Sequence, residues 1–317
     1  MTGVATRPRG RKGRPRGKNQ RRETMAAFAF LSPWIIGFLV LTAGPMVISL
    51  VLSFTNYDGL QETRGVGWEN YEKLLSDPKI RKSLSNTMIY AVMIVPSTMI
   101  VSLALASMLS RIGRRSAGVF RTLFYLPEVT PKVAIGVLFL LLFNGQVGMV
   151  NWALGLVGID GPQWSTDGPW VKPGLVLMNL WSVGGTVVIY LAALNNVPRD
   201  LYEAAALDGV SAWQRFRHVT MPMISGALFF TLIIQTISAL QTFDEAYAAF
   251  YGSAASAGYS SDAALFYLIY LFQQAFQFLH MGYASAMAWL LFVIIMIITA
   301  IQVKVSKRFV YYEGGDR

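Results

Sequence analysis

Two ionisable residues, Glu128 and Lys132, lie inside an apolar stretch that is long enough to cross a membrane. The acid precedes the base by four positions, which is the favourable order for mutual neutralisation on one helix face. Pro127 and Pro131 flank the pair and weaken the backbone hydrogen bonding there. Ionisable groups inside spanning segments are rare and are often functional. Two interpretations stay open, a structural ion pair near the interface and a part of an inner gate.

A second set of candidates is uncharged. Amide groups, hydroxyl groups and aromatic rings recognise hydroxyl-rich molecules through hydrogen bonds and stacking. Residues of these types in two apolar stretches are Asn179, Trp181, Gln235, Ser238, Gln241 and Phe243. Gln235 and Ser238 have helical spacing, and Gln241 is predicted to continue the same face. Interhelical hydrogen bonds, or a position that faces the lipid headgroup layer, explain any one of them at least equally well. Asp244 and Glu245 are predicted to lie at the outer end of the span, in a loop.

The sequence lacks the motifs of common enzyme chemistry. It contains no cysteine, which excludes disulfides and thiolate metal sites. Its two histidines, His218 and His280, are predicted on opposite sides of the membrane, so they form no metal site. The nearest match to a phosphate-binding loop, at 17–19, lacks the upstream glycine and the hydroxyl residue that binds magnesium. We therefore expect this chain to bind no cofactor and to hydrolyse no ATP.

The composition is that of a membrane protein. Hydrophobic residues make up 54% of the chain and charged residues 14%, whereas soluble proteins carry about a quarter charged residues. Runs long enough to cross a bilayer lie near 28–52, 86–109, 120–143, 174–194, 223–243 and 285–303. The sequence thus predicts an all-α polytopic membrane protein with six transmembrane helices. No repeat is visible, and we treat 26–309 as one domain.

The basic residues orient these six spans. They concentrate in alternate segments, namely the arm 1–25, Arg111 to Arg115, Arg199 to Arg217, and Lys304 to Arg308. Because positive residues stay on the cytoplasmic side, both termini are predicted inside, with a short tail at 310–317. The arm carries much of the net charge of +10. It has no apolar anchors, so we expect it to be disordered and to meet anionic lipid rather than nucleic acid.

Two outer segments are less regular. The segment 263–279 is apolar but contains three glutamines and is slightly short for a span. A seventh crossing would also place Lys304 outside, so an external interfacial or partly re-entrant helix is preferred, with its aromatic residues at headgroup depth. The tryptophan-, glycine- and proline-containing segment 155–173 is predicted to form an ordered outer loop that meets an external partner.

The most specific pattern is the polar segment 198–222 between two apolar runs. Pro198 suits a helix start, and Asp200 and Glu203 lie in the first turns, where the helix dipole favours anions. Gly209 can adopt the left-handed conformation that ends a helix. Ser211 and Gln214 have capping-box spacing for a second short helix. The sequence predicts a helix, a glycine bend and another helix, which Pro222 ends.

This segment resembles the cytoplasmic "EAA" loop of permease subunits of binding-protein-dependent ABC importers. The residues that carry the resemblance are Leu201, Glu203, Ala204, Ala205, Asp208, Gly209, Phe216 and Pro222. Met221 departs from the leucine usual in the family and conserves its volume. Further similarity to sugar permeases of the maltose and glycerol-phosphate type extends from about Phe30 to Phe309, through the blocks 53–57, 67–71, 120–127, 243–245 and 282–286.

The resemblance implies the type I importer permease fold, a function and a set of partners. The segment 199–216 would dock as a coupling helix into a cleft on an ATP-hydrolysing subunit. A second, similar permease chain, two ATPase copies that hold ATP and magnesium, and an external substrate-binding protein would complete the transporter. A sugar or related polyol would be bound near mid-membrane between the two permease chains, and this chain would move it without modifying it.

Three other interpretations stay open. An ion-coupled secondary transporter needs membrane-embedded acids or broken helices that coordinate ions, and apart from Glu128 the predicted spans lack such acids. A membrane-bound regulator or receptor would not depend on a partner ATPase. The segment 198–222 could also be an ordinary amphipathic connection between two spans. None of these accounts for the spacing of the EAA-like residues.

Overall fold

The computed structural model describes residues 18–60, 62–112, 114–252 and 262–310. This part of the chain is helical, with one isolated β-bridge between Thr55 and Gly65. The longer elements are α1 (Lys18–Phe38), α2 (Gly44–Leu52), α4 (Pro78–Leu109), α5 (Arg114–Tyr125), α6 (Lys132–Leu142), α8 (Gly168–Asn179), α9 (Gly184–Asn195), α10 (Arg199–Leu207), α13 (Ser225–Leu240) and α16 (Met281–Ser306). The shorter helices are α3 (Glu69–Ser76), α7 (Met149–Gly155), α11 (Ala212–Arg215), α12 (Met221–Met223), α14 (Asp244–Phe250) and α15 (Tyr267–Phe272).

The chain divides into two compact units, Met1–Leu52 and Ser53–Arg317. In the first, α1 continues through the π-helical turn η1 (Leu39–Ala43) into α2, and Arg22–Leu52 is apolar and long enough to cross a membrane. From the sequence we predicted that 26–309 is one domain, whereas the division into two units falls within this range, after Leu52. No residue in the apolar window of the span Arg22–Leu52 is buried. The helix also begins at Lys18, so 18–25 of the predicted arm are helical, whereas 1–17 lie outside the described residues.

The structure bears out the six predicted spans with two of them bent. In the described residues, four helical segments are long and apolar enough to cross a membrane, and the number is six if each of two bent helix pairs forms one span. The predicted span 174–194 corresponds to α8 and α9, which meet at an angle of 55° through the 3₁₀ turn η3 (Leu180–Ser182). The predicted span 223–243 extends to Phe250, because α14 continues it after a short break.

The predicted span 120–143 is not a continuous helix. It consists of α5, the 3₁₀ turn η2 (Leu126–Val129) and α6, which are bent by 94°. Thr130 and Pro131 between them are extended, since a residue before proline disfavours the helical conformation. Glu128 and Lys132 therefore lie on opposite sides of a break, and the prediction that they share one helix face is wrong. Between the two side chains the described structure has no ion pair.

The segment 263–279 is not among the helical segments long enough to span a membrane. It forms α15 and the π-helical turn η6 (Gln273–Gln277), which together extend only about 16 Å. Phe266, Tyr267 and Tyr270 are buried in the core, where the Tyr267 hydroxyl donates to the Met287 carbonyl at 2.9 Å and the Tyr267 N–H donates to Thr87 Oγ1 at 2.9 Å, whereas Phe276 and Phe278 are exposed. The expected position at headgroup depth does not hold for Phe266, Tyr267 and Tyr270, because these rings pack inside the second unit, where α15 contacts α4 and α16.

The sequence blocks at the outer end come together in space. Asn70 Nδ2 donates to the carbonyl oxygens of Ser53 and Thr55, at 2.9 and 2.8 Å. The N–H of Gly282 donates to the Tyr57 carbonyl at 2.9 Å. A side chain at Gly282 would meet the Thr55 carbonyl, so the close approach requires glycine. Three blocks that are far apart in sequence thus fix the start of α16 against the chain that follows the first span.

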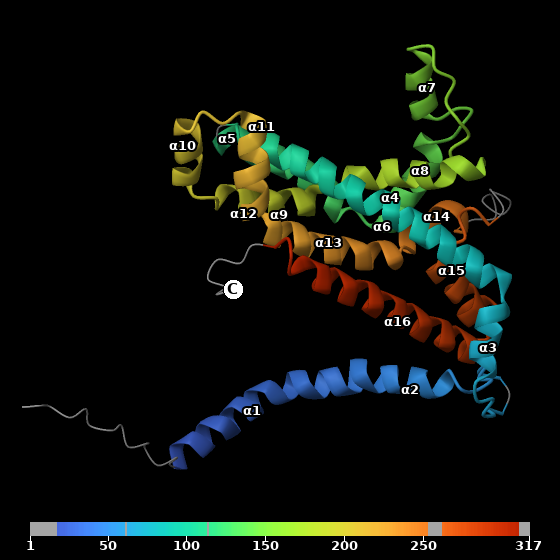
Figure 1. Ribbon diagram of the computed structural model, residues 1–317. Coiled ribbons are helices and arrows are strands. Elements are labelled where there is room, and N and C mark those ends of the chain that lie inside the picture. Colours follow the sequence, from blue (N-terminus) through green and yellow to red (C-terminus); the bar gives the residue numbers. More distant parts are fainter. Residues whose placement is uncertain (1–17, 61, 113, 253–261, 311–317) are drawn as a thin grey trace, which may run out of the picture. The chain divides into compact units, whose positions relative to one another are not determined.

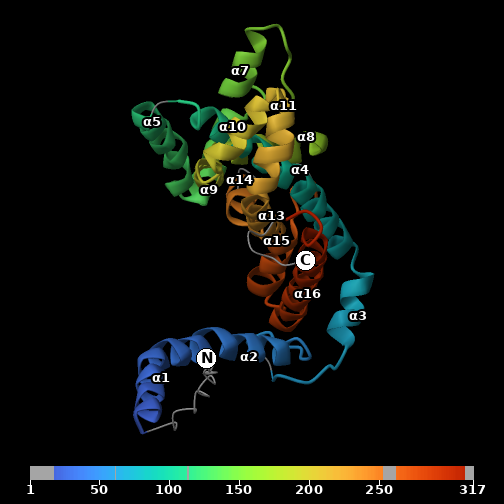
Figure 2. The same ribbon diagram turned by 60° about the vertical axis from the view of Figure 1, so that its left-hand side comes forward.

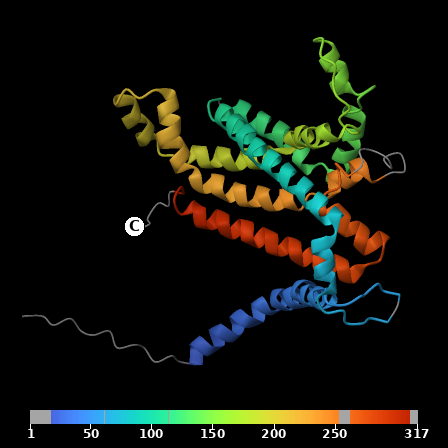
Figure 3. The same cartoon turned by 45° about the vertical axis from the view of Figure 1, so that its right-hand side comes forward.

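The long helices α4, α9, α13 and α16 run lengthwise through the second unit (Figure 1). Figures 1 and 3 show α10 and α11 at one end of this unit and α3 and α15 at the opposite end. Helix α4 runs between these ends and packs on α9 and α13, while α14 packs on α6. Figure 2 shows α16 beside α13 and α15, which it contacts. The basic residues predicted to be cytoplasmic place the α10–α11 end inside and the α3–α15 end outside.

Replacing Gly136 with valine is expected to destabilise the second unit by about 1–3 kcal/mol. Gly136 lies where α6 meets α14, and a Cβ there would meet the Glu245 carbonyl oxygen and lie 2.9 Å from Ala248 Cβ. Backbone atoms cannot move aside as a flexible side chain can, so the two helices must separate. Thermal unfolding of the purified protein in detergent measures the change. Gly118→Val is the matched control, since its Cβ would meet nothing within 4 Å; an equal loss in both variants would contradict the prediction.

Candidate functional site

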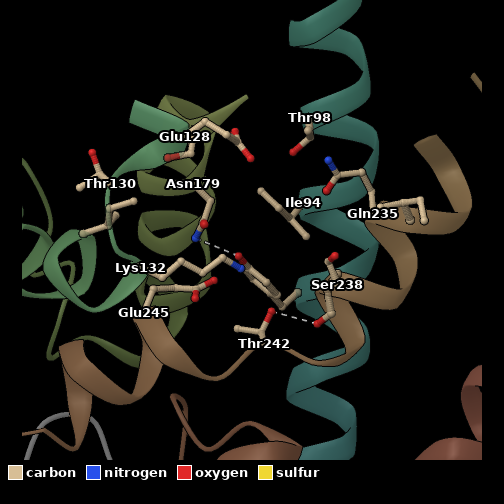
Figure 4. A pocket seen from close by; sticks show the side chains of 15 residues that line it. Ile94, Thr98, Glu128, Thr130, Lys132, Asn179, Gln235, Ser238, Thr242 and Glu245 are labelled. Atoms are coloured by element: carbon tan, nitrogen blue, oxygen red, sulfur yellow. Dashed lines mark hydrogen bonds between the residues drawn. The ribbon is translucent and has the colours of Figure 1, made fainter. Parts of the chain in front are cut away.

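A polar cavity of about 220 Å³ lies between α4, α8, α13, α14 and the break between α5 and α6. Its polar lining consists of Tyr90, Thr98, Glu128, Thr130, Lys132, Asn179, Ser182, Gln235, Ser238, Thr242 and Glu245. Figure 4 shows that Lys132 and Glu245 enter it from one side and Gln235 and Ser238 from the other. Five of the eight residues predicted for a substrate path or a gate line this cavity: Asn179, Gln235, Ser238, Glu128 and Lys132.

The cavity is lined by hydrogen-bonding groups that are already held in place. Asn179 Nδ2 donates to the Tyr90 hydroxyl at 3.1 Å and to the Leu175 carbonyl at 3.0 Å. Gln235 Nε2 donates to Thr186 Oγ1 at 2.9 Å, which joins α13 to α9. Gln235 therefore makes an interhelical hydrogen bond and also lines the cavity. Such bonds orient the amide oxygens before any ligand arrives.

Two buried oxygen atoms of the cavity lining have no hydrogen-bond partner in the described structure. They are Oε2 of Glu245 and Oγ of Ser182. Glu245 is only 4% exposed. A buried carboxyl oxygen without a partner is costly, whereas a hydrogen bond from a ligand offsets that cost. These two atoms are therefore suited to a ligand that donates hydrogen bonds.

Glu245 lies in a different part of the structure from the one that we predicted from the sequence. It was predicted in an outer loop, but Asp244 and Glu245 open α14, which continues the fifth span. Gln241 ends α13 and Phe243 has the non-helical angles φ −144° and ψ −65°, so the chain turns there and directs Glu245 inward. The helical period of 3.6 residues, when it is extended along the sequence, does not predict such a break. The only signal in the sequence was an acid adjoining an apolar run.

Three predicted residues lie outside the polar cavity. Gln241 is exposed, because the helix ends there and the face shared by Gln235 and Ser238 does not continue. The Phe243 ring stacks on Tyr247, with a centroid distance of 5.1 Å, and packs on Phe272. Trp181 lines a separate apolar cavity of about 270 Å³ and is 65% exposed. The predicted roles of these three side chains in a polar site have no support in the geometry.

The predicted coupling segment has the expected helix–bend–helix form. Helix α10 begins after Pro198, which is its N-cap residue rather than its first helical position. Gly209 has φ +70°, the left-handed conformation predicted for it. The capping box is present, with Ser211 N donating to Gln214 Oε1 at 2.8 Å and Gln214 N donating to Ser211 Oγ at 3.3 Å. Pro222 does not end the pattern but lies inside α12, and the break follows at Ile224.

The two short helices present an exposed surface at the cytoplasmic end. Leu201, Glu203, Ala204, Asp208 and Gly209 are exposed, whereas Ala205 and Phe216 are half-buried. This exposed surface of α10 and α11, here called the coupling surface, also includes two large apolar side chains that were not predicted from the sequence. They are Leu207, which is 90% exposed, and Trp213, which is 68% exposed.

One internal contact holds the coupling surface to the spans. The Tyr202 hydroxyl and Thr220 Oγ1 are 3.0 Å apart, which joins α10 to the π-helical turn η4 (Phe216–Thr220). The ring of Trp213 stacks on Phe216 with a centroid distance of 5.7 Å. Because η4 leads through α12 into α13, a force on α10 reaches the helix that carries Gln235 and Ser238. The arrangement can transmit motion from the cytoplasmic end to the polar cavity.

Comparisons with known proteins agree with this geometry. Residues 98–311 match the family model of the binding-protein-dependent transport system inner membrane component. The chain is 39% identical to YesP, a probable ABC transporter permease protein of Bacillus subtilis, over 95% of this chain and 96% of YesP. It is 34% identical to LacF, the lactose transport system permease protein of Rhizobium radiobacter, over 86% of this chain and 91% of LacF.

The fold is also that of a solved transporter. A chain in the crystal structure of a bacterial alginate ABC transporter, in complex with a pentasaccharide-bound periplasmic protein, matches with a TM-score of 0.79 at 22% identity. The match covers 92% of this chain and 98% of that one. The expected importer permease fold is thereby confirmed. With the family model covering most of the sequence, the chain belongs to the inner-membrane components of binding-protein-dependent transport systems.

Proposed function

We propose that this permease subunit moves a sugar or related polyol across the cytoplasmic membrane, and that the polar cavity is its part of the substrate path. The observation that carries the proposal is the pair of buried oxygen atoms, Glu245 Oε2 and Ser182 Oγ, without hydrogen-bond partners in the described cavity. Sugar hydroxyls are donors that such oxygens accept. Similar proteins include a lactose transport permease and a chain of an alginate transporter, and both support the same substrate class.

The partners of this chain follow from its family and from its surfaces. An ABC importer of this family works with a binding protein. We propose in addition that a second, similar permease chain completes the cavity, and that the transporter contains two copies of an ATPase, one of which docks on the coupling surface of this chain. ATP and magnesium would bind to the ATPase copies, and this chain would hold neither. Leu201, Leu207 and Trp213 supply the apolar contacts for docking, and Glu203 and Asp208 supply charge.

Coupling is then a difference in stability between two conformations. Closure of the ATPase pair would pull α10, and the Tyr202–Thr220 contact would carry the displacement through η4 and α12 to α13. The break at Thr130 and Pro131 lets α5 and α6 tilt independently, which suits Glu128 and Lys132 to a gate. Nucleotide biases the equilibrium from one side of the membrane and the binding protein from the other.

Transport by proteoliposomes tests the function. The complete transporter, reconstituted with ATP inside and binding protein outside, is expected to accumulate a labelled sugar when ionophores have collapsed all ion gradients. Omission of ATP or of the binding protein should reduce uptake to the level of empty vesicles. Labelled histidine is a control substrate that should not accumulate. Uptake that persists without ATP and disappears with ionophores would identify an ion-coupled transporter instead.

A further inference from the structure

Another hollow, about 600 Å³ in volume, lies at the outer end of the second unit. It is formed by the first turns of α4 and α8 and by the turn before α15. Its charged lining consists of Lys79, Lys82, Lys172 and Asp262. Because this lysine hollow is separate from the polar cavity and shares no residue with it, the transport site does not account for it.

The charges of the lysine hollow are unbalanced. Three ammonium groups face one carboxyl group, and the described structure has no ion pair that involves any of the four side chains. The hollow also lies at the first turns of two helices, whose N-termini carry partial positive charge. The segment 253–261 next to Asp262 contains no acidic residue that could compensate. The surface therefore attracts anions.

A neighbouring carboxyl group, that of Asp77, is engaged with other partners. Its Oδ2 accepts hydrogen bonds from the hydroxyls of Tyr270, at 2.6 Å, and Tyr283, at 2.9 Å. Burial alone would raise the pKa of Asp77, but these bonds and those from the backbone N–H groups of Lys79 and Ile80 lower it overall. Asp77 is thus held toward α15 and α16 and does not line the hollow.

The walls of the lysine hollow are fixed to the helices that line the polar cavity. Asn86 on α4 donates to the carbonyl oxygens of Asp262, at 2.6 Å, and Leu265, at 3.0 Å. Lys82 precedes the cavity residue Tyr90 by eight positions on α4, and Lys172 precedes Asn179 by seven on α8. At about 1.5 Å per residue, the hollow lies only about 10–12 Å from the cavity lining along both helices.

We propose that Lys79, Lys82 and Lys172 form a docking surface for acidic side chains of the external substrate-binding protein. The inference rests on the proposed function, since it needs such a partner on the outer side. Three lysines attract an acidic surface because the charges are complementary. Since the lysines lie at the outer ends of α4 and α8, docking there acts on two helices that line the polar cavity. Anionic lipid headgroups are the other possible source of negative charge.

Binding of the cognate binding protein to the complete transporter, in nanodiscs of neutral phosphatidylcholine, tests the docking surface. The triple variant Lys79→Gln, Lys82→Gln, Lys172→Gln is expected to weaken binding about tenfold at low salt, since exposed ion pairs each contribute modestly. The difference should shrink at high salt, where charges are screened. Arg81→Gln is the matched control, because Arg81 is exposed on α4 but lies outside the hollow. It is expected to bind like the unchanged protein.

The outcomes distinguish a failure of the docking surface from a failure of the proposed function. Restored affinity when an acidic residue of the binding protein and one of the three lysines are exchanged in charge would support the docking surface. Equal affinity of the triple variant and the unchanged transporter would overturn it, and so would a loss that appears only in nanodiscs of anionic lipid. If the unchanged transporter bound no binding protein at all, the proposed function would fail, and the docking surface with it.

Discussion

Replacing Gly209 with valine is expected to reduce ATP-driven uptake by at least about tenfold, while the protein still inserts into the membrane. Gly209 has φ +70°, which costs a β-branched residue roughly 1–2 kcal/mol, and that energy corresponds to about a tenfold change in an equilibrium. A Cβ there would meet nothing within 4 Å, so the effect comes from backbone conformation alone. The bend that sets α10 against α11 would open, and the coupling surface would no longer fit its ATPase. Uptake and co-purification of the ATPase measure the loss.

A matched variant distinguishes coupling from general damage. Gly226→Val places the same side chain in α13, where a Cβ also meets nothing within 4 Å and no left-handed conformation is required. Uptake by this variant should stay near that of the unchanged protein. Glu203→Lys, which reverses a charge on the coupling surface without changing the backbone, should resemble Gly209→Val. Normal uptake in both Gly209→Val and Glu203→Lys would remove the case for coupling through this segment.

Replacing Glu245 with glutamine is expected to lower the apparent affinity for the transported sugar by roughly tenfold to a hundredfold. Hydrogen bonds to a charged group contribute about 1.5–3 kcal/mol, and a neutral amide of the same shape loses that advantage. The change leaves the backbone contact between α14 and Gly136 intact, so assembly with the ATPase should persist. The concentration dependence of sugar uptake measures the shift.

Two neighbours on the fifth span supply the comparison for Glu245. Gln235→Ala removes another cavity residue and should alter affinity or sugar preference to a smaller extent, since its amide already bonds to Thr186. Gln241→Ala changes an exposed residue outside the cavity and should have no effect on affinity. An unchanged affinity in Glu245→Gln would show that the polar cavity is not the sugar site. A loss of ATPase assembly in that variant would point to a structural role instead.

The sequence predicted the local features of the coupling segment well. A left-handed glycine, a capping box and a short helix depend on residues within a few positions of one another, and Gly209, Ser211 and Gln214 behave as expected. The exposure of Leu207 and Trp213 was not predicted. Whether an apolar side chain is covered depends on the path of distant segments, which local patterns do not contain.

The candidate site could be predicted only in part. Asn179, Gln235 and Ser238 were found because hydrogen-bonding side chains are unusual in apolar runs, and all three line one cavity. Glu245 was misplaced and Gln241 was wrongly included, for the same reason: the helix breaks at 241–243 and resumes as α14. A periodic extrapolation continues through such a break, whereas the chain changes direction.

The sequence by itself determined the membrane class, the number of spans, their orientation and the helix–bend–helix segment, because hydropathy, charge bias and capping act over short distances along the chain. Only the tertiary structure decided which spans bend, that Glu245 faces the interior, that Phe266, Tyr267 and Tyr270 are buried, and that three lysines from two helices meet at one hollow. These features depend on the packing of segments that lie far apart in the sequence, as in the bond between Tyr283 and Asp77, which are 206 residues apart, and such packing leaves no periodic trace in the sequence.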